Sequence, residues 1–230
     1  MRFPAPESEA LEAVILNTAG GIAGGDRHEV RIALEENARM VVTTAAAEKI
    51  YRSTGPESEI GVTLKVDAGA QLSWLPQETI LFDRARLKRR IDVELGDNST
   101  IFLAEMAVFG RSARGEAVAQ GLFADHWRVR RAGRLIFAES VRLDGSIAQK
   151  LSEPAVAADG VAIATVLVAP GDDAMATRVR ALHFLGEAGI SAWNGIAVAR
   201  LCAKNGATLR DDLVAVITAL GAPLPRLWLN

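Results

Sequence analysis

Four glutamates recur at related places in this sequence and are its best candidates for handling a metal ion. Each follows a turn motif and lies an even number of residues past the apolar residue that resumes after the turn: eight for Glu48, six for Glu78, four for Glu105 and four for Glu139. In an unbroken strand an even offset keeps side chains on one face. Stacked strands could therefore line an interior surface with oxygen ligands that hold a divalent cation weakly and release it.

A structural explanation of the same glutamates stays open. Pro76 and the run of three alanines at 45–47 interrupt the strands before Glu78 and Glu48. The glutamates would then lie at strand ends and form ion pairs with Arg52, Arg111 and Arg142, which is the more frequent arrangement of such side chains.

Other chemistries find little support. The segment 20–25 has four glycines in six positions, but no Gly-Lys-Ser/Thr and no capped helix follow it. Nucleotide binding would need both, so we predict a tight β turn whose glycines let adjacent layers pack. His28, His126, His183 and Cys202 are far apart in the sequence and show no metal-ligand spacing. A nucleophile elbow of the Gly-x-Ser-x-Gly type, which a hydrolytic site could use, is absent as well.

The elements that must position the glutamates follow an eleven-residue pattern that recurs three times at a spacing of about thirty residues. Each copy has alternating apolar residues, a small polar turn and a second apolar run, which predicts strand, turn and strand. The aligned positions are Val30, Ile32, Leu34 and Met40; Val62, Leu64, Val66 and Leu72; and Ile91, Val93, Leu95 and Ile101. A weaker fourth copy turns at Ala132 and Gly133. Because so short a unit cannot close a core alone, the copies are expected to stack.

The period changes in the C-terminal part. A strand is predicted over 161–168, then a helix capped by Asp172 or Asp173 that runs to about Gly186, with Gly189 just past its end. A strand over 196–201 precedes a second helix that starts at Thr208 as N-cap and stops at Gly221 and Pro223. We therefore predict a mainly β fold, a right-handed β-helix-like stack over 1–160 with a smaller α/β part with two helices over 161–230, packed as one structural unit.

Composition restricts the partners and the compartment. Half of the 230 residues are apolar and the net charge is −2, which points to neither nucleic acid nor an anionic membrane as a partner. Five basic residues in the seven positions 84–90 are expected in a solvated loop or strand edge. No apolar run approaches the ~20 residues of a membrane helix, and no signal peptide is apparent. A single cysteine, Cys202, fits a reducing compartment, so a cytoplasmic protein is expected.

Several ungapped blocks resemble signature segments of a known family. They are Leu16-Asn17-Thr18-Ala19-Gly20-Gly21 with Gly24-Gly25-Asp26, the segment 47–53, the segment 74–83, Phe109-Gly110-Arg111 with Gly115-Glu116, Arg142-Leu143-Asp144-Gly145, the segment 191–195, and Pro225-Arg226-Leu227-Trp228. In this order they resemble the urease accessory proteins called UreD or UreH, over nearly the whole chain.

The resemblance implies a scaffold that is not an enzyme. Such a protein binds the urease apoprotein and recruits UreF and, through it, the GTPase UreG to assemble the nickel centre, with no cofactor of its own and as a dimer within the accessory complex. An acidic interior passage for nickel is implied, with Asp26, Glu48, Glu105 and Glu139 as the positional hypotheses. The matched residues expected to be structural or to contact partners are Asn17, Thr18, Gly20, Gly21, Gly24, Gly25, Tyr51, Arg52, Glu78, Asp83, Arg111, Glu116, Asp144, Trp193, Arg226 and Trp228.

One departure from the family and two alternatives remain. Members carry several dozen residues before the Leu-Asn-Thr-Ala-Gly-Gly segment, whereas fifteen precede it here, so the chain is either truncated or lacks the first layers, and its edge strands would invite pairing.

One alternative function is a carboxylate-based hydrolase or lyase with two carboxylates about 5 to 10 Å apart in an open cleft. The other is a pure interaction module without a passage.

Overall fold

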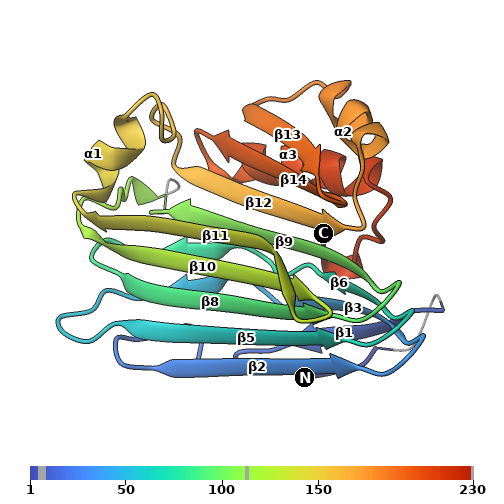
Figure 1. Cartoon of the computed structure of the whole chain (residues 1–230). Helices are drawn as coiled ribbons and strands as arrows, with labels where there is room; N and C mark the ends of the chain where they lie inside the picture. Colours follow the sequence, from blue (N-terminus) through green and yellow to red (C-terminus); the bar gives the residue numbers. More distant parts are fainter. Residues whose placement is uncertain (5–8, 112–113, 229–230) are drawn as a thin grey trace.

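Two β sheets face each other in the computed structural model, which describes residues 1–4, 9–111 and 114–228 (Figure 1). The larger sheet has the order β1 (Leu11–Ile15), β3 (Arg39–Thr44), β6 (Gln71–Trp74), β9 (Thr100–Phe109), β12 (Ala162–Ala169), β14 (Ile196–Ala203) and β13 (Glu187–Trp193), with β4 (Glu48–Ile50) paired to β7 (Thr79–Leu81) and β7 to β9. The smaller sheet has the order β11 (Arg134–Gly145), β10 (Gly121–Arg131), β8 (Arg86–Leu95), β5 (Ser58–Val66) and β2 (Arg27–Leu34).

The predicted repeat is confirmed as a solenoid-like stack. The first strand of each copy joins one parallel ladder, in which Val30 pairs with Val62 and Val62 with Ile91. The second strands form a parallel ladder in the other sheet, where Met40 pairs with Leu72 and Leu72 with Ile101. The central turn residue of each copy has positive φ, 60° at Asn37, 66° at Gly69 and 54° at Asn98. Asn and Gly tolerate that conformation, so each copy crosses between the sheets at the same point.

The fourth copy folds differently from the other three. β10 and β11 pair antiparallel within the smaller sheet, so the chain turns back instead of crossing to the larger sheet. Ala132 and Gly133 have φ of 48° and 74°, and two consecutive positive φ angles are typical of a tight two-residue hairpin. The smaller sheet therefore ends at β11, while the larger sheet continues.

The C-terminal part extends the larger sheet and covers its outer face. β12 pairs antiparallel with β9, and β14 and β13 follow. The helices α2 (Asp173–Arg180) and α3 (Gly206–Ala219) pack on the outer face, and Trp228 of the short helix η2 (Arg226–Trp228) joins the same core cluster. The short helix α1 (Ile147–Ser152) packs in a different cluster. None of the helices in the described part of the chain is long and apolar enough to cross a membrane.

Two helix boundaries differ from the sequence prediction. Asp172 caps α2 as expected, but α2 ends at Arg180 and Gly189 lies within β13. Between the two elements, the Asp212 carboxylate of α3 accepts hydrogen bonds from the backbone N–H groups of Leu185 at 2.9 Å and Gly186 at 2.8 Å, which holds the chain in the turn that leads into β13. The N-cap of α3 is Asn205 and not Thr208, because the Asn205 side-chain oxygen accepts a hydrogen bond from the Thr208 backbone N–H at 2.8 Å.

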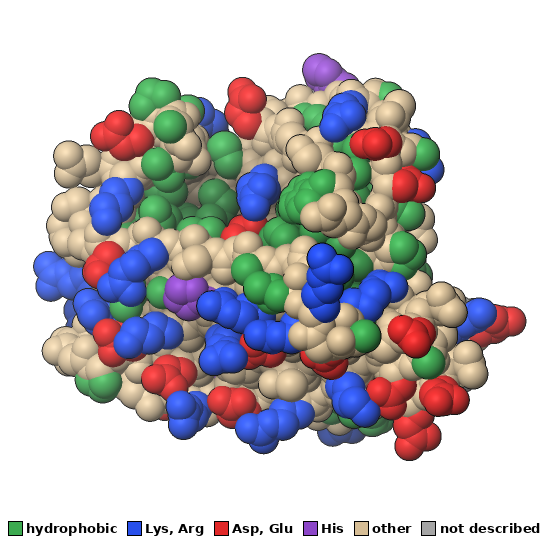
Figure 2. Space-filling view, in the orientation of Figure 1, with side chains coloured by type: hydrophobic (Ala, Val, Ile, Leu, Met, Phe, Trp, Pro, Cys, Tyr) green, Lys and Arg blue, Asp and Glu red, His purple; other side chains and the backbone are tan. Residues whose placement is uncertain are grey.

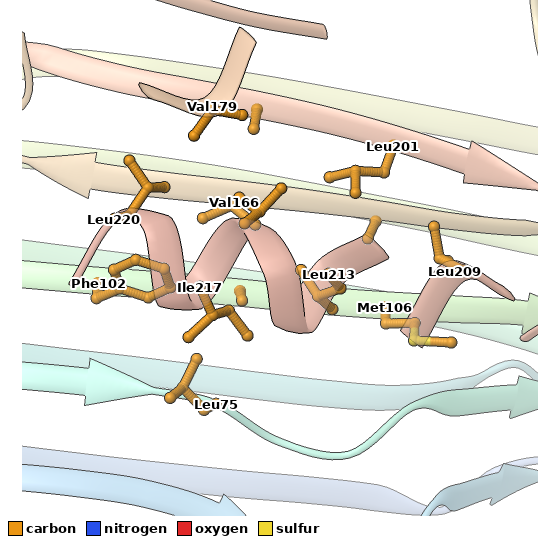
Figure 3. Packing of buried hydrophobic residues seen from close by; sticks show 14 of the residues in the cluster. Leu75, Phe102, Met106, Val166, Val179, Leu201, Leu209, Leu213, Ile217 and Leu220 are labelled. Atoms are coloured by element: carbon orange, nitrogen blue, oxygen red, sulfur yellow. The ribbon is translucent and has the colours of Figure 1, made fainter. Parts of the chain in front are cut away.

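The core has two layers that share β9. The outward residues of β9, including Phe102 and Met106, pack under Leu209, Leu213 and Ile217 of α3 (Figure 3). The inward residues Ile101 and Leu103 pack against the smaller sheet. Because β9 is buried on both faces, any polar side chain on it must find its hydrogen-bond partners inside the protein.

Candidate functional site

A buried ion-pair cluster joins the two sheets at the centre of the molecule. Arg89 on β8 donates to Asp125 on β10 through Nε at 3.0 Å and Nη2 at 2.6 Å. Its Nη1 donates to the carboxylate of Glu105 on β9 in the facing sheet. The three side chains are 4%, 9% and 5% exposed. A single guanidinium therefore bridges two carboxylates in a place with almost no water.

Indole groups hold both carboxylates in position. The Trp74 Nε1–H donates to Glu105 at 2.7 Å, and the Trp127 Nε1–H donates to Asp125 at 3.0 Å. The Thr79 hydroxyl lies 3.4 Å from Nη1 of Arg89. Glu105 therefore accepts from Trp74 with one oxygen and from Arg89 with the other, whereas Oδ2 of Asp125 accepts from both Arg89 and Trp127. These bonds fix the orientation of both carboxylates.

Burial and charge pairing act against each other in the cluster. Burial alone would lower the pKa of Arg89, but the charges of Asp125 and Glu105 raise it above its ordinary value, so the guanidinium stays protonated. Burial raises the pKa of the Glu105 carboxyl, and the charge of Arg89 and the bond from Trp74 oppose that shift. At Glu105 burial prevails over these opposing effects, so this carboxyl holds its proton more strongly than a solvated glutamate does.

Strand register explains why these residues meet. Arg89 and Asp125 are direct partners in the parallel pairing of β8 and β10. Glu105 is the direct partner of Thr165 in the pairing of β9 with β12, and Thr165 is in turn opposite Arg200 on β14. Side chains that are direct partners lie on the same face of a sheet. Each sheet therefore presents a polar row to the space between the sheets.

Three cavities adjoin one another along these polar rows. The entrance cavity, with a volume of 240 Å³, is lined by both sheets, and its wall includes Asn17, His28, Glu48, Trp74, Arg89 and Glu105. The middle cavity has only 20 Å³ and is lined by Arg89, Glu105, Asp125, Trp127, Glu139 and Thr165, among others. The far cavity has 370 Å³ and includes Glu139, Thr165, Glu187, Arg200 and Cys202 in its wall. Neighbouring cavities share lining residues, so the three trace a path from Glu48 past Arg89 to Cys202.

The two ends of this path differ in character. At the entrance, the Asn17 amide donates to the Glu48 carboxylate at 2.8 Å. At the far end, Glu139 accepts bonds from Arg200 at 2.5 Å and from the Thr165 hydroxyl at 3.3 Å. The far cavity opens where the smaller sheet ends at β11, and Figure 2 shows this hollow between α1 and β13 with hydrophobic side chains around it. Burial, reinforced by the charge of Glu187, raises the pKa of the Cys202 thiol there.

The predicted glutamates divide between the interior and the surface. Glu48, Glu105 and Glu139 line the three cavities. Glu78 lies beyond Pro76 on the other side of the larger sheet, 3.5 Å from Nη1 of Arg210. Asp26 is in an exposed turn, where its carboxylate accepts a hydrogen bond from the Ala23 backbone N–H at 2.8 Å. No group of three or more His, Cys, Asp or Glu residues in the described ranges could hold a metal ion.

The ion pairs proposed as the structural alternative have other partners. Glu105 pairs with Arg89, and Glu139 with Arg200. Arg111 pairs with Glu116 at 2.5 Å and lies 4.0 Å from the ring centre of Phe82, while Arg142 pairs with Asp144. Arg52 is exposed, with an isolated β-bridge to Ala85. The Asp83 carboxylate accepts a bond from the Gln120 backbone N–H at 3.1 Å.

The glycine-rich segment packs layers together, as predicted. The Tyr51 hydroxyl donates to the carbonyl of Gly20, which has φ of 80°. A Cβ on Gly21 would lie 2.6 Å from the Tyr51 ring, and one on Gly24 would lie 2.2 Å from Ser53 Oγ. Gly25 has φ of 90° and belongs to the same exposed turn. Neighbouring Thr18 is exposed and lines the entrance cavity.

The C-terminal motif residues occupy different environments. Trp193 in β13 is 40% exposed and touches Phe137 with ring centres 6.4 Å apart. Trp228 is buried and its Nε1–H donates to the Leu75 carbonyl at 3.0 Å. Arg226 is exposed in η2. Trp228 therefore has a packing role, whereas Trp193 presents an aromatic surface.

Arg89 and Asp125 are the two interior residues that the sequence analysis missed. Arg89 was counted within the basic run 84–90, expected at a loop or an edge, but β8 lies between β5 and β10. Arg86, Lys88 and Arg90 do point outward, on a face that Figure 2 shows covered by Lys and Arg, and Arg89 points inward between Leu87 and Ile91. A period of two carried through β8 and β10 would have placed both residues inside.

The buried carboxylates do not have the arrangement that the hydrolase alternative requires. A carboxylate hydrolase needs two carboxylates with separate tasks in an open cleft. Glu105 and Asp125 are instead buried and bound to the same guanidinium.

Comparison with known proteins places the chain in a family. A sequence model described as UreD urease accessory protein matches residues 1–229. The Urease accessory protein UreD of Rhodopseudomonas palustris (strain BisA53) is 58% identical over 232 residues, which cover 100% of this chain and 81% of that protein. The protein of the same name from Bradyrhizobium diazoefficiens is 57% identical over 232 residues, covering 100% of this chain and 84% of that protein. The chain therefore belongs to the UreD family of urease accessory proteins.

Proposed function

We propose that this chain is a scaffold for assembly of the nickel centre of urease. It binds the urease apoprotein in the cytoplasm and recruits UreF and, through UreF, the GTPase UreG. Membership of the UreD family supports the urease part of this proposal. The glycine-rich turn packs around Tyr51 and Ser53, so its glycines have a structural role. In this proposal, GTP hydrolysis is supplied by UreG. A dimer within the accessory complex stays a prediction.

We further propose that nickel crosses the chain between the two sheets. The observation that carries this is the series of adjoining cavities, because Glu48, Glu105 and Glu139 stand at successive points along it. Each offers carboxylate oxygens without the full ligand set of a permanent site. Nickel is therefore cargo that exchanges between carboxylates along the path.

The scaffold role is tested in cells that express the urease subunits with UreF and UreG. Urease is purified, and its activity and bound nickel are compared with and without this chain. We expect nickel per urease to fall to background when the chain is omitted, with the amount of urease protein unchanged. Equal nickel loading in both cultures would refute the scaffold role. Copurification of the chain with UreF, but not with urease, would restrict the role to recruitment.

A further inference from the structure

A pocket of 670 Å³ lies on the outer side of the larger sheet, away from the interior path. It is bounded by the start of α3, by β7 and by the end of β9, and its lining is apolar at Ile80 and Val108. The polar side chains that line it are Glu78, Arg111, Arg114, Asn205 and Arg210. The pocket therefore combines an apolar surface with a wall in which arginine predominates.

The charges of this wall do not cancel among the described residues. Arg210 lies 3.5 Å from Glu78, and Arg111 pairs with Glu116. The Arg114 guanidinium makes no hydrogen bond or ion pair with any residue in the described ranges. One positive charge is thus left over, which a single carboxylate from outside would balance. A phosphate group, with its charge of about −2, would exceed it.

The first turn of α3 forms part of the same pocket through Gly206 and Ala207. The Thr208 backbone N–H already donates to the side chain of the N-cap Asn205. The N–H groups of Gly206 and Ala207 have no acceptor in the described part of the chain. Because no acidic residue is present in this turn, the positive end of the helix adds to the charge of the arginines.

Glu78 contributes a hydrogen-bond acceptor that lacks a donor. Its Oε2 atom is buried and makes no hydrogen bond within the described residues, although Nη1 of Arg210 lies 3.5 Å from it. A buried acceptor without a donor is costly, and every polypeptide segment except at proline carries backbone N–H donors. The pocket therefore offers cations to a carboxylate and an acceptor to an N–H group beside it, a combination that a free inorganic anion does not use.

We propose that this pocket binds an acidic segment of a partner polypeptide. A carboxylate of the segment contacts Arg114 and the first turn of α3, and a neighbouring backbone N–H donates to Glu78. An apolar side chain next to the carboxylate packs on Ile80 and Val108. The existence of the site does not depend on the role in urease maturation, whereas the assignment of the segment to a component of the urease complex rests on the proposed function.

The test is an NMR titration of the purified, ¹⁵N-labelled full chain with the peptide acetyl-Leu-Glu-Leu-amide, followed at the backbone amides of Gly206 and Ala207. The uncharged peptide acetyl-Leu-Gln-Leu-amide and sodium phosphate are titrated in the same way. We expect saturable shifts of both amides with the acidic peptide. The Gln peptide should bind about tenfold more weakly, because it lacks the charge-assisted hydrogen bonds, and phosphate should also bind more weakly. Absence of saturable shifts, equal binding of the two peptides, or phosphate binding as tight as that of the acidic peptide would overturn the proposal.

Two matched variants test where the carboxylate of the peptide binds. Ala207→Glu puts a carboxylate at the exposed second residue of α3, where it competes for the cations of the pocket and suits the helix N-terminus, so the fold is retained. Ala174→Glu makes the same change at the exposed second residue of α2, outside the pocket. We expect Ala207→Glu to lose peptide binding and Ala174→Glu to bind like the wild type. Peptide binding retained by Ala207→Glu, or lost equally in both variants, would contradict the site.

Arg114→Gln tests the unpaired cation itself. Because its guanidinium has no partner among the described residues, the substitution should leave the melting temperature unchanged while it weakens peptide binding about tenfold. Unchanged peptide affinity would show that Arg114 does not hold the carboxylate and would overturn the proposal as stated.

Peptide binding and maturation can fail independently. In cells, copurification of Ala207→Glu with the urease subunits, UreF and UreG is compared with that of Ala174→Glu. Loss of one of these proteins from Ala207→Glu alone would identify the owner of the segment, and unchanged copurification of all of them would overturn its assignment to the urease complex. If the acidic peptide binds while the wild-type chain has no effect on urease, the pocket stands and the maturation role falls. If the peptide does not bind while the chain supports nickel loading, the pocket is wrong and the scaffold role stands.

Discussion

Arg89 and Asp125 are direct partners on the adjacent parallel strands β8 and β10, and both side chains point into the space between the two sheets. Arg89 is a charged residue at an inward position of β8, whereas the other inward positions of this strand hold Leu, Ile and Val. Glu105 reaches the same guanidinium from the facing sheet. The contact therefore couples the two halves of the sandwich and at the same time fills the interior path.

The buried ion pair predicts an uneven response to mutation. Arg89→Met should lower the free energy of unfolding by about 3–5 kcal/mol, because it leaves two buried carboxylates without their cation. Arg89→Met/Glu105→Gln/Asp125→Asn should recover most of that loss, since no buried charge remains. Urea denaturation of the three proteins measures both effects. If Arg89→Met were as stable as the wild type, the Arg89–Asp125 pair would not be buried in solution.

The glycine-rich turn predicts a contrast between two glycines. A Cβ on Gly21 would lie 2.6 Å from the Tyr51 ring and 2.8 Å from the Lys49 carbonyl oxygen, whereas nothing lies within 4 Å of one on Gly55. Gly21→Ala should therefore destabilise the chain by about 1–3 kcal/mol through overpacking. Gly55→Ala is the matched control and should be neutral or slightly stabilising. Thermal unfolding of both decides, and equal melting temperatures would contradict the packing described for this turn.

The start of α3 predicts which polar residue caps it. Asn205→Ala removes the acceptor of the Thr208 backbone N–H and should cost about 1 kcal/mol of stability. Thr208→Ala should cost less, because the Thr208 side chain does not make that cap. The two variants are compared by chemical denaturation with circular dichroism. The reverse order would restore Thr208 as the N-cap.

The Arg111–Glu116 pair predicts a pH dependence of stability. The hydrogen bond from Arg111 is the main reason that the pKa of Glu116 lies below its ordinary value of 4.5. A carboxyl with a lowered folded-state pKa contributes stability above its unfolded pKa and loses it as pH falls through the folded value. Glu116→Gln should therefore melt at a lower temperature than the wild type at pH 7, with the gap closing as pH falls from 5 to 3. A gap that is constant with pH would contradict the pair.

Much of the fold could be predicted from the sequence, because each copy of the repeat has apolar residues at alternating positions. The two parallel ladders and the turns at Asn37, Gly69 and Asn98 follow from the aligned pattern. The hairpin of β10 and β11 could not be separated from a fourth crossing, because both begin as strand, turn and strand. The turn between α2 and β13 is held by Asp212, a residue of α3 that binds the backbone of 185 and 186. A contact with so distant a residue could not be predicted from the local sequence pattern.

Only some residues of the candidate site could be predicted from the sequence. Even spacing correctly placed Glu105 on the inward face of an unbroken strand. Glu139 is also inward, but not by that rule, because a bulge in the pairing of β10 with β11 puts its reference residue Leu135 on the outer face. The rule failed for Glu78, because Pro76 ends the alternation and sends the chain to the outer side of the sheet. Arg89 was hidden in a basic run, and its partner Asp125 belongs to a different strand, so only the pairing of β8 with β10 brings the two together.

The central claim is that nickel reaches urease through the interior of this chain, and the nickel content of urease matured by a Glu48→Gln/Glu139→Gln variant tests it most directly. Both substitutions remove carboxylates at the ends of the path, where Glu48 and Glu139 line the entrance and far cavities. Glu36→Gln, at an exposed turn, serves as the control. We expect the double variant to copurify with urease as well as the wild type does, while nickel per urease falls several-fold and the control has no effect. Full nickel loading by the double variant, with complex formation intact, would contradict an interior passage.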